Sequence, residues 1–366
     1  MKKVALLLVL VTLVWSVSAC AGDAEAEGEG GRRAPVTLTG AGATFAMPLI
    51  TLWASEYEPV SRDRVNYNSI GSGGGIRAHV DRTVQFAASE APLNAEQYER
   101  APGTLTIPFT IGTVTLAFNL PGVEELRLTG DVLADIYLAN IRRWGDPRIR
   151  ALNPDADLPD RGIVVVHRSD GSGTTYVVAD YLSKVSAEWR ERVGVGTSLS
   201  WPTGIGGNGN EGVAGAIRNN PYSIGYIELS YASNMGIPTA AIRNQAGRFI
   251  RPSLEAGTAA AGAAVDHLPA GHERWTEVSF TDAPGDDSYP ISSFSYFFVY
   301  EDLDRLGGDM TAERAESVVR WLEWSITDGQ AHNGRVQNAA IPSAVQRLNL
   351  ETLDRITFNG ERVRRW

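Results

Sequence analysis

Apolar residues in this chain occur in short strand-like runs and in longer stretches where they recur every three or four residues. The runs predict buried strands, at 36–39, 65–70, 163–166 and 223–228. The recurring stretches predict amphipathic helices, at 45–57, 77–83, 131–141, 174–185, 311–327 and 343–356. Strands and helices alternate along the chain, which indicates an α/β fold class.

Two apolar runs are much longer than the others. They are Leu105–Leu120, broken only by Pro108 and Gly112, and Tyr289–Tyr300. After the first 35 residues about 330 remain, which is more than one hydrophobic core usually organises. We therefore expect two α/β lobes, with these two runs crossing between them.

The first 20 residues have the pattern of a secretory signal peptide. A basic start, Met1–Lys3, precedes an apolar stretch, Val4–Trp15, and then small residues that end at Cys20. This end resembles the lipobox of bacterial lipoproteins, in which the cysteine is lipidated and begins the mature chain. The alternative is an ordinary signal peptide that happens to end in cysteine. Because Cys20 is the only cysteine, no disulfide accounts for it.

Charge and composition narrow the class of protein. Residues 21–35 are mostly glycine, alanine and acidic side chains, which predicts a disordered tether. The formal net charge of −10 falls to −12 without Lys2 and Lys3, so we expect no basic surface for nucleic acid. With 43% hydrophobic and 21% charged residues, the rest is typical of a soluble globular protein. The sequence thus predicts an extracytoplasmic protein, in the periplasm or at the cell surface, anchored to the membrane as a lipoprotein.

Three segments rich in glycine and hydroxyl residues carry the candidate chemistry. They are Gly40–Phe45, Gly71–Gly75 and Arg168–Thr175, and each follows a predicted strand and precedes a predicted helix. Such turns direct backbone N–H groups and hydroxyls toward one place, where the helix end adds partial positive charge. With one arginine, Arg168, and one acid, Glu90, the pattern indicates a small anion held mostly by neutral donors.

Motifs for other chemistries are missing or weak. There is no Gly-Lys pair for a P-loop, and no Gly-x-Ser-x-Gly for a hydrolase elbow. Gly73–Ala78 matches a loose dinucleotide pattern but lacks the ribose-binding acid expected about 20 residues later. The histidines have no metal-ligand spacing, and His167 is interpreted as the end of a strand. We therefore expect a protein that is not an enzyme, with no catalytic residue, metal or cofactor.

Four motifs together resemble the PstS-type phosphate-binding proteins of the bacterial Pst ABC phosphate uptake system. They are Gly40–Phe45, Tyr67–Gly75, Phe86–Leu93 and Arg168–Thr175, with supporting stretches at 130–138, 201–207 and 224–228. The resemblance implies a type II periplasmic-binding-protein fold with two α/β lobes joined by two hinge strands. It places lobe 1 at 36–111 and 292–366, lobe 2 at 112–291, and the ligand in the cleft between them. The expected partners are inorganic phosphate and the membrane permease of an ABC transporter, and the expected state is a monomer.

The resemblance also implies the ligand contacts. They fall on Thr44, Phe45, Ser72, Glu90, Arg168, Ser172, Gly173 and Thr174. Asp170 is expected to orient Arg168 without contacting the ligand. One motif departs from the family, which usually has aspartate where this chain has Glu90 and glycine where it has Ala88. The longer Glu90 side chain keeps the acceptor chemistry and lengthens the reach of the carboxylate by one carbon.

The physical role of such an acid can be stated independently of the family. Hydrogen phosphate carries a proton that a buried carboxylate can accept, whereas sulfate at neutral pH offers none. A site built on a hydrogen bond can reject the analogue that lacks it by ~10⁴–10⁵-fold. Two alternatives stay open: a binding protein for another tetrahedral oxyanion (sulfate, arsenate or molybdate), and a phosphoesterase.

Overall fold

The computed structural model describes residues 34–365 except residue 264. The predicted signal peptide, Cys20 and residues 21–33 of the predicted tether lie outside the described residues. From Pro35 onward the described residues form one compact unit. All that follows concerns this unit.

The unit is a mixed α/β structure. Its strands are β1 (Thr37–Gly42), β2 (Arg64–Ser69), β3 (Phe86–Ser89), β4 (Thr104–Asn119), β5 (Arg127–Leu128), β6 (Val164–Arg168), β7 (Ile205–Gly207), β8 (Ser223–Glu228), β9 (Ala241–Arg243), β10 (Phe249–Ile250), β11 (Ser292–Tyr300), β12 (Thr357–Phe358) and β13 (Glu361–Arg362).

The α-helices are α1 (Met47–Ser61), α2 (Ser72–Val80), α3 (Ala95–Arg100), α4 (Gly130–Tyr137), α5 (Pro147–Leu152), α6 (Gly173–Val185), α7 (Ala187–Arg192), α8 (Gly209–Asn219), α9 (Leu229–Met235), α10 (Leu254–Gly262), α11 (Ala312–Ile326) and α12 (Ser343–Leu353). Three short 3₁₀ helices, η1 (Val265–His267), η2 (Leu303–Leu306) and η3 (Asp328–Val336), complete the described elements.

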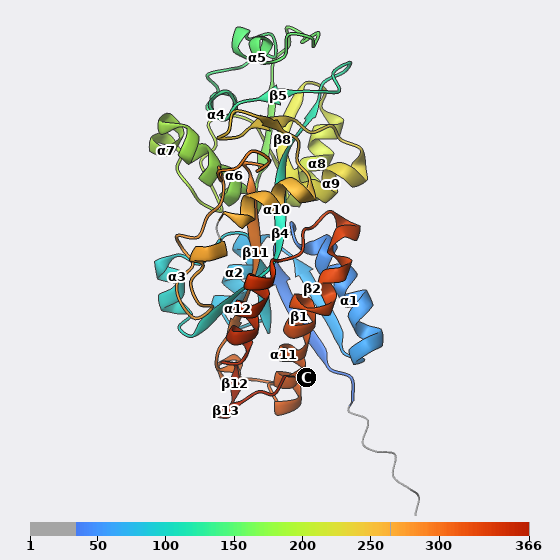
Figure 1. The fold of residues 1–366 in the computed structure, drawn as a ribbon, viewed down its shortest axis with the longest axis vertical. Coiled ribbons are helices and arrows are strands. Elements are labelled where there is room, and N and C mark those ends of the chain that lie inside the picture. Colours follow the sequence, from blue (N-terminus) through green and yellow to red (C-terminus); the bar gives the residue numbers. More distant parts are fainter. Residues whose placement is uncertain (1–33, 264, 366) are drawn as a thin grey trace, which may run out of the picture. The chain divides into compact units, whose positions relative to one another are not determined.

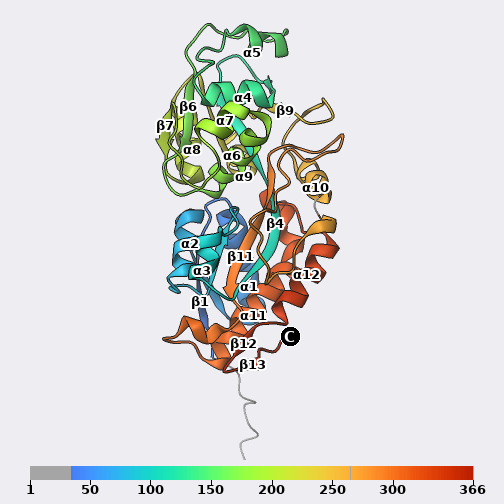
Figure 2. The same ribbon diagram turned by 90° about the vertical axis from the view of Figure 1, so that its left-hand side faces the viewer.

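Eight strands form one sheet in the order β2-β1-β3-β11-β4-β8-β6-β7. The long strand β4 links its two halves: residues 104–113 pair with β11, and residues 114–119 pair with β8. Figures 1 and 2 both show β4 and β11 running side by side. We call β1, β2, β3, β11 and residues 104–113 the first half of the sheet, and β6, β7, β8 and residues 114–119 the second half.

Each half has its own helical cover. In the first half, α1 packs on β2 and α2 on β1 and β3. In its core, Trp53 meets Trp321 and Trp324 edge to face, and these two stack on each other. In the second half, α8 packs on β6, β7 and β8, while α6 packs on β8 with α4 behind it. Val213 and Ile217 of α8 belong to a separate small apolar cluster, so the second half is covered on both faces.

Most of the predicted elements are confirmed. The strand predicted at 223–228 is β8, and the two long runs contain most of β4 and all of β11. The helices predicted near residues 45, 131, 174, 311 and 343 are α1, α4, α6, α11 and α12. The α/β fold class is therefore confirmed. The lobe boundaries at residues 111 and 291 stay a prediction.

One helix was wrongly placed. The helix predicted at 77–83 begins at Ser72 instead, so the glycine-rich segment forms its first turn rather than a loop before it. Glycine disfavours a helix by about 1 kcal/mol per residue, but here close approach requires it. A Cβ on Gly75 would lie 2.5 Å from the Cα of Gly42, and one on Gly73 would lie 3.0 Å from the Cα of Gly171.

Candidate functional site

The candidate residues come from the carboxyl ends of parallel strands in both halves of the sheet. Strand β1 pairs in parallel with β2 and β3, and β6 pairs in parallel with β7 and β8. Thr44 and Phe45 follow β1, Ser72 begins α2 after β2, and Glu90 follows β3. Arg168 ends β6 and leads through a short turn into α6. In open α/β sheets, this edge is where ligands bind.

Glu90 is a fully buried carboxylate held by two hydroxyl groups. Ser72 Oγ donates to its Oε2 at 3.0 Å, and Ser295 Oγ of β11 donates to its Oε1 at 3.0 Å. Burial raises the pKa of Glu90 to about 7, against the lowering effect of these two hydrogen bonds and of the Arg168 charge. A carboxylate has about four lone-pair sites, so at least one is left for a further donor.

Arg168 is equally buried, with its side chain 1% exposed. Its Nε donates to Asp170 Oδ1 at 2.7 Å and its Nη2 to Asp170 Oδ2 at 2.5 Å, while Nη1 donates to Thr174 Oγ1 at 3.2 Å. The bidentate contact with Asp170 fixes the plane of the guanidinium group. Burial raises the pKa of Asp170, but the hydrogen bonds and charge of Arg168 outweigh it and hold that pKa below its usual value.

Free backbone donors surround these charges. Within the described residues, the amides of Thr44 and Phe45 donate to no protein acceptor. Gly173 and Thr174 are the first two residues of α6, where helical geometry leaves amides without an intrahelical partner. The hydroxyl of Ser172 caps this helix by accepting from Thr175 N at 3.0 Å. The 13-residue helix α6 therefore presents its positive end here.

The two halves of the sheet approach each other closely at this place. Gly73 N donates to Gly171 O at 2.9 Å, and Tyr231 Oη donates to Thr44 O at 2.7 Å. A Cβ on Gly173 would lie 2.5 Å from Ser72 Oγ and would also overlap the Glu90 carboxylate. The beginning of α6 is therefore in reach of Glu90, and only glycine fits between them.

Known proteins match this chain over most of its length. A family model described as a PBP superfamily domain matches residues 25–328. The phosphate-binding protein PstS of Pasteurella multocida is 41% identical over 311 residues, which cover 84% of this chain and 87% of that protein. The PstS of Methanocaldococcus jannaschii is 34% identical over 367 residues, which cover 95% and 94%. The chain belongs to the PstS family.

A solved structure extends the likeness to the fold. A high-affinity periplasmic phosphate-binding protein bound with phosphate superposes with a TM-score of 0.68 at 18% identity, covering 88% of this chain and 99% of that one. Family membership and this likeness together give the two-lobed type II periplasmic-binding-protein fold that the sequence predicted. The relatives of this PstS-family chain are named as binding proteins, not as enzymes.

Sequence reasoning missed several residues of this PstS-family site. Ser295 lies in the apolar run 289–300, and Asn210 lies in none of the motifs that predicted the site. Asn210 Nδ2 donates to Thr44 Oγ1 at 2.9 Å, so it contacts a predicted ligand residue directly. Glu228, fully buried at the end of β8, has a pKa raised to about 8, chiefly by burial, against bonds from Ser230 and with a further raising effect from Glu90. Its Oε1 has no hydrogen-bond partner among the described residues.

Other features of the described residues lie outside this cluster. His167 stacks on Trp201 with ring centroids 4.8 Å apart, which fits its interpretation as the end of a strand. No group of three or more His, Cys, Asp or Glu side chains in residues 34–365 is placed to hold a metal ion. Among the helices of that same part of the chain, none combines the length and apolarity that crossing a membrane requires.

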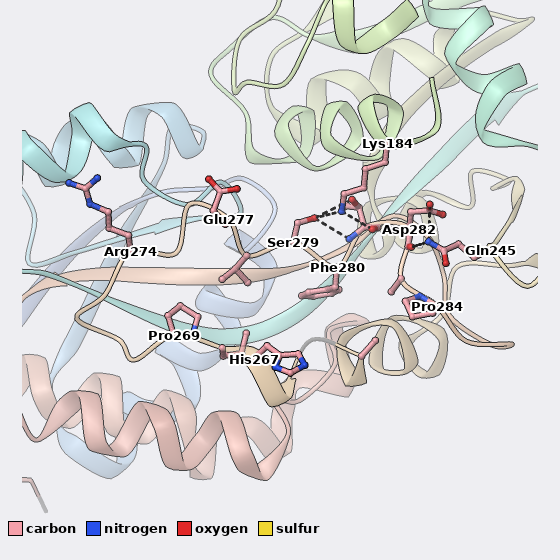
Figure 3. Close-up of a pocket in the computed structure, with 15 residues that line it drawn as sticks. Lys184, Gln245, His267, Pro269, Arg274, Glu277, Ser279, Phe280, Asp282 and Pro284 are labelled. Atoms are coloured by element: carbon pink, nitrogen blue, oxygen red, sulfur yellow. Dashed lines mark hydrogen bonds between the residues drawn. The ribbon is translucent and has the colours of Figure 1, made fainter. Parts of the chain in front are cut away.

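A surface cavity of about 690 Å³ lies apart from the site, along the segment from His267 to Pro284 (Figure 3). Its cation at one end, Lys184, is already bonded: Nζ donates to Ser279 Oγ at 2.7 Å and to Thr281 O at 2.9 Å. None of the motif residues lines it. The polar groups that the candidate motifs bring together are those between the two sheet halves.

Proposed function

We propose that this chain is an extracytoplasmic solute-binding protein that captures inorganic phosphate between its two lobes and delivers it to the permease of an ABC transporter. The observation that carries the proposal is the convergence of three features: the Arg168–Asp170 pair, the beginning of α6, and the buried acceptor Glu90. Membership of the PstS family supports the same conclusion. We expect the protein to act as a monomer, with no nucleic-acid partner.

The charge of the site suits a small anion that must be released again. Asp170 balances most of the positive charge of Arg168, so attraction comes mainly from amide and hydroxyl dipoles. Dipoles fixed before the ligand arrives stabilise an anion strongly in a water-free site. When the lobes separate, the donors of Thr44 and Phe45 move away from those of Arg168 and Thr174, and the anion loses the hydrogen bonds of one lobe.

We assign each residue a role on this basis. The amides of Thr44, Phe45, Gly173 and Thr174 donate to phosphate oxygens, together with the hydroxyls of Thr44 and Thr174 and a remaining N–H of Arg168. Ser172 caps α6 and sets the direction of its first amides. Asp170 holds Arg168 in place without touching the ligand.

Glu90 is the group that selects for phosphate. Ionised, it accepts the hydrogen bond of a protonated phosphate oxygen, and sulfate has no such proton to give. Ser72 and Ser295 stabilise this ionised form because they donate to it. A pKa of about 7 also means that a protonated Glu90 is available near neutral pH, and that form can donate to sulfate. Sulfate is therefore rejected less completely as pH falls through this value.

The lobes are residues 36–111 with 292–366, and residues 112–291, as the sequence predicted. The pairing of β4 supports this division, because its partner changes from β11 to β8 between residues 113 and 114. Val114 N also donates to Ile291 O at 2.9 Å, so both predicted crossings meet at this level. Bending there would open the site while leaving each half of the sheet intact.

Cys20, outside the described residues, is proposed as the lipidated end of the mature chain. Replacing it with serine removes the thiol that accepts lipid. Cys20→Ser should then move from the membrane fraction to soluble or unprocessed protein in cell fractionation. Equal membrane fractions for the two proteins would refute lipid anchoring without touching the binding proposal.

Calorimetry tests the binding proposal. The protein is unfolded, freed of carried-over ligand by dialysis, refolded, and titrated with phosphate, arsenate, sulfate and molybdate. We expect phosphate and arsenate, which both carry a proton near neutral pH, to bind more tightly than the others. Tighter binding of sulfate or molybdate would make this a transporter protein for another oxyanion, and no heat with any of them would overturn the proposal. Release of phosphate from a phosphomonoester by the purified protein would support the phosphoesterase alternative instead.

A further inference from the structure

Asn210, the second residue of α8, is a fully buried amide that touches both halves of the sheet. Its Nδ2 donates to Thr44 Oγ1 at 2.9 Å, and its backbone N donates to the same oxygen at 3.2 Å. The second hydrogen of Nδ2 faces Thr174 Oγ1 at 3.4 Å. One side chain therefore joins a hydroxyl after β1 to a hydroxyl at the beginning of α6.

The direction of the Asn210 amide is fixed by its other end. Oδ1 accepts from the backbone N of Glu228 at 3.0 Å. A backbone N–H can only donate, so the oxygen of the amide must lie on that side. Both N–H groups are consequently turned toward Thr44 and Thr174, and the amide cannot flip without losing all three bonds.

These bonds determine where the hydroxyl protons go. A hydroxyl oxygen has two lone pairs and one proton. Thr44 Oγ1 accepts from Asn210 N and Nδ2, and Thr174 Oγ1 accepts from Asn210 Nδ2 and Arg168 Nη1. Each oxygen has used both lone pairs, so each hydroxyl is left as a donor. Within the described residues neither O–H has a protein acceptor.

We propose that Asn210 is a positioning residue of the anion site, which turns the protons of the Thr44 and Thr174 hydroxyls toward the ligand. The inference rests on the proposed function for the identity of the ligand, a doubly charged tetrahedral oxyanion. A hydroxyl that is free to rotate meets an anion with a lone pair as readily as with a proton, and it must be reoriented on binding. With Asn210 in place, both hydroxyls are oriented before the ligand arrives.

Two substitutions test this inference by calorimetry with inorganic phosphate. Asn210→Ala leaves the hydroxyls free to rotate and should weaken phosphate binding roughly 10-fold. Asn210→Asp replaces the donors with a carboxylate that draws the hydroxyl protons to itself and adds negative charge, so the loss should reach roughly 100-fold or more. Wild-type affinity in both variants would overturn the inference. If the wild-type protein itself does not bind phosphate, the proposed function fails instead.

Asn208→Asp is the matched control. Asn208 precedes α8 in the same turn, is exposed, and makes no side-chain bond to cap the helix. The variant adds the same charge two residues away, so it measures the long-range electrostatic effect alone, which we expect to stay below about 3-fold. A loss as large as that of Asn210→Asp would show that charge, not hydroxyl direction, explains the result.

A double-mutant comparison separates positioning from a merely structural role. In a Thr44→Val, Thr174→Val background there are no hydroxyl protons to direct. In this background, Asn210→Ala should lower the apparent phosphate affinity, derived from the thermal shift, less than about 2-fold. In the wild-type background the same substitution should lower it roughly 10-fold. The same loss in both backgrounds would refute action through the hydroxyls. If Asn210→Ala does not fold without phosphate, Asn210→Ser, which keeps a polar group at this position, is compared in the same two backgrounds.

Discussion

Glu90 and Arg168 belong to opposite halves of the sheet, and the hydroxyl groups around them use their protons in opposite ways. Beside Glu90, Ser72 and Ser295 give their protons to the protein's own carboxylate. Beside Arg168, the Thr174 hydroxyl accepts from the protein and keeps its proton. The hydroxyls around Glu90 therefore leave the ligand an acceptor, next to the Thr44 and Phe45 donors of the same half, and the side of Arg168 offers donors alone.

This difference gives the donors and the acceptor separate roles in binding. Donors recognise any tetrahedral oxyanion, because all such anions present oxygen lone pairs. An acceptor recognises only an anion that still carries a proton. We infer that affinity comes mostly from the donors of Arg168, α6, Thr44 and Phe45, and selectivity mostly from Glu90. Changes to the donors and to the acceptor should therefore have distinguishable effects.

The largest effect is expected from Arg168→Ala. The variant removes the cation of the site and leaves Asp170 partly buried without its ion-pair partner. By analogy with broken buried pairs, its free energy of unfolding should fall by about 3–5 kcal/mol. Phosphate affinity should fall by at least roughly 10²-fold. Phosphate at ~100 times the wild-type dissociation constant, which stabilises the wild type by ~2.7 kcal/mol, should give almost no thermal shift.

Arg143→Ala is the control for this variant, because Arg143 forms an exposed ion pair with Asp160 at 2.6 Å. It should keep the full phosphate-induced shift. A full shift in Arg168→Ala as well would place the anion site elsewhere in the molecule.

A smaller effect is expected from pH. Because burial raises the pKa of Glu90 from 4.5 to about 7, its protonated fraction grows as pH falls through that value. The protonated carboxyl can donate to sulfate, so sulfate affinity should rise by roughly 10-fold between about one pH unit above and one below the pKa. The phosphate preference should narrow accordingly. Calorimetry with sulfate across this range measures the effect, and a flat profile would contradict the assigned titration of Glu90.

The smallest effect is expected from Ser295→Ala. Its hydroxyl lowers the pKa of Glu90, so removing it should shift the sulfate profile upward by about one pH unit or less. Ser292→Ala is the matched control, since Ser292 lies buried in the same strand but donates to Tyr289 O at 3.1 Å. Equal sulfate profiles for the two variants would show that the Ser295 hydroxyl does not lower the pKa of Glu90.

The sequence predicted the parts of the site that are local in the chain. Arg168 and Asp170, which pair in the structure, are two residues apart in the chain, and a strand–turn–helix pattern locates them. Asn210 and Ser295 were missed because their partners, Thr44 and Glu90, are 166 and 205 residues distant. No local pattern encodes such a contact. The predicted beginning of α2 was wrong for a related reason. The glycines in its first turn are explained only by the backbone that packs against them.

The most direct test of this division is the ratio of phosphate to sulfate dissociation constants in the wild type, Glu90→Gln and Thr174→Val, measured by calorimetry on protein freed of ligand. The amide of Glu90→Gln offers an N–H that sulfate can use and loses the charged acceptor that phosphate needs. We expect Glu90→Gln to bind phosphate more weakly and sulfate more tightly, so that the ratio of the two dissociation constants narrows by roughly 10-fold or more. Thr174→Val should bind both anions more weakly and leave the ratio within about 3-fold of the wild type. An unchanged ratio in Glu90→Gln, or a ratio that moves only in Thr174→Val, would contradict the claim that selectivity lies on the side of Glu90.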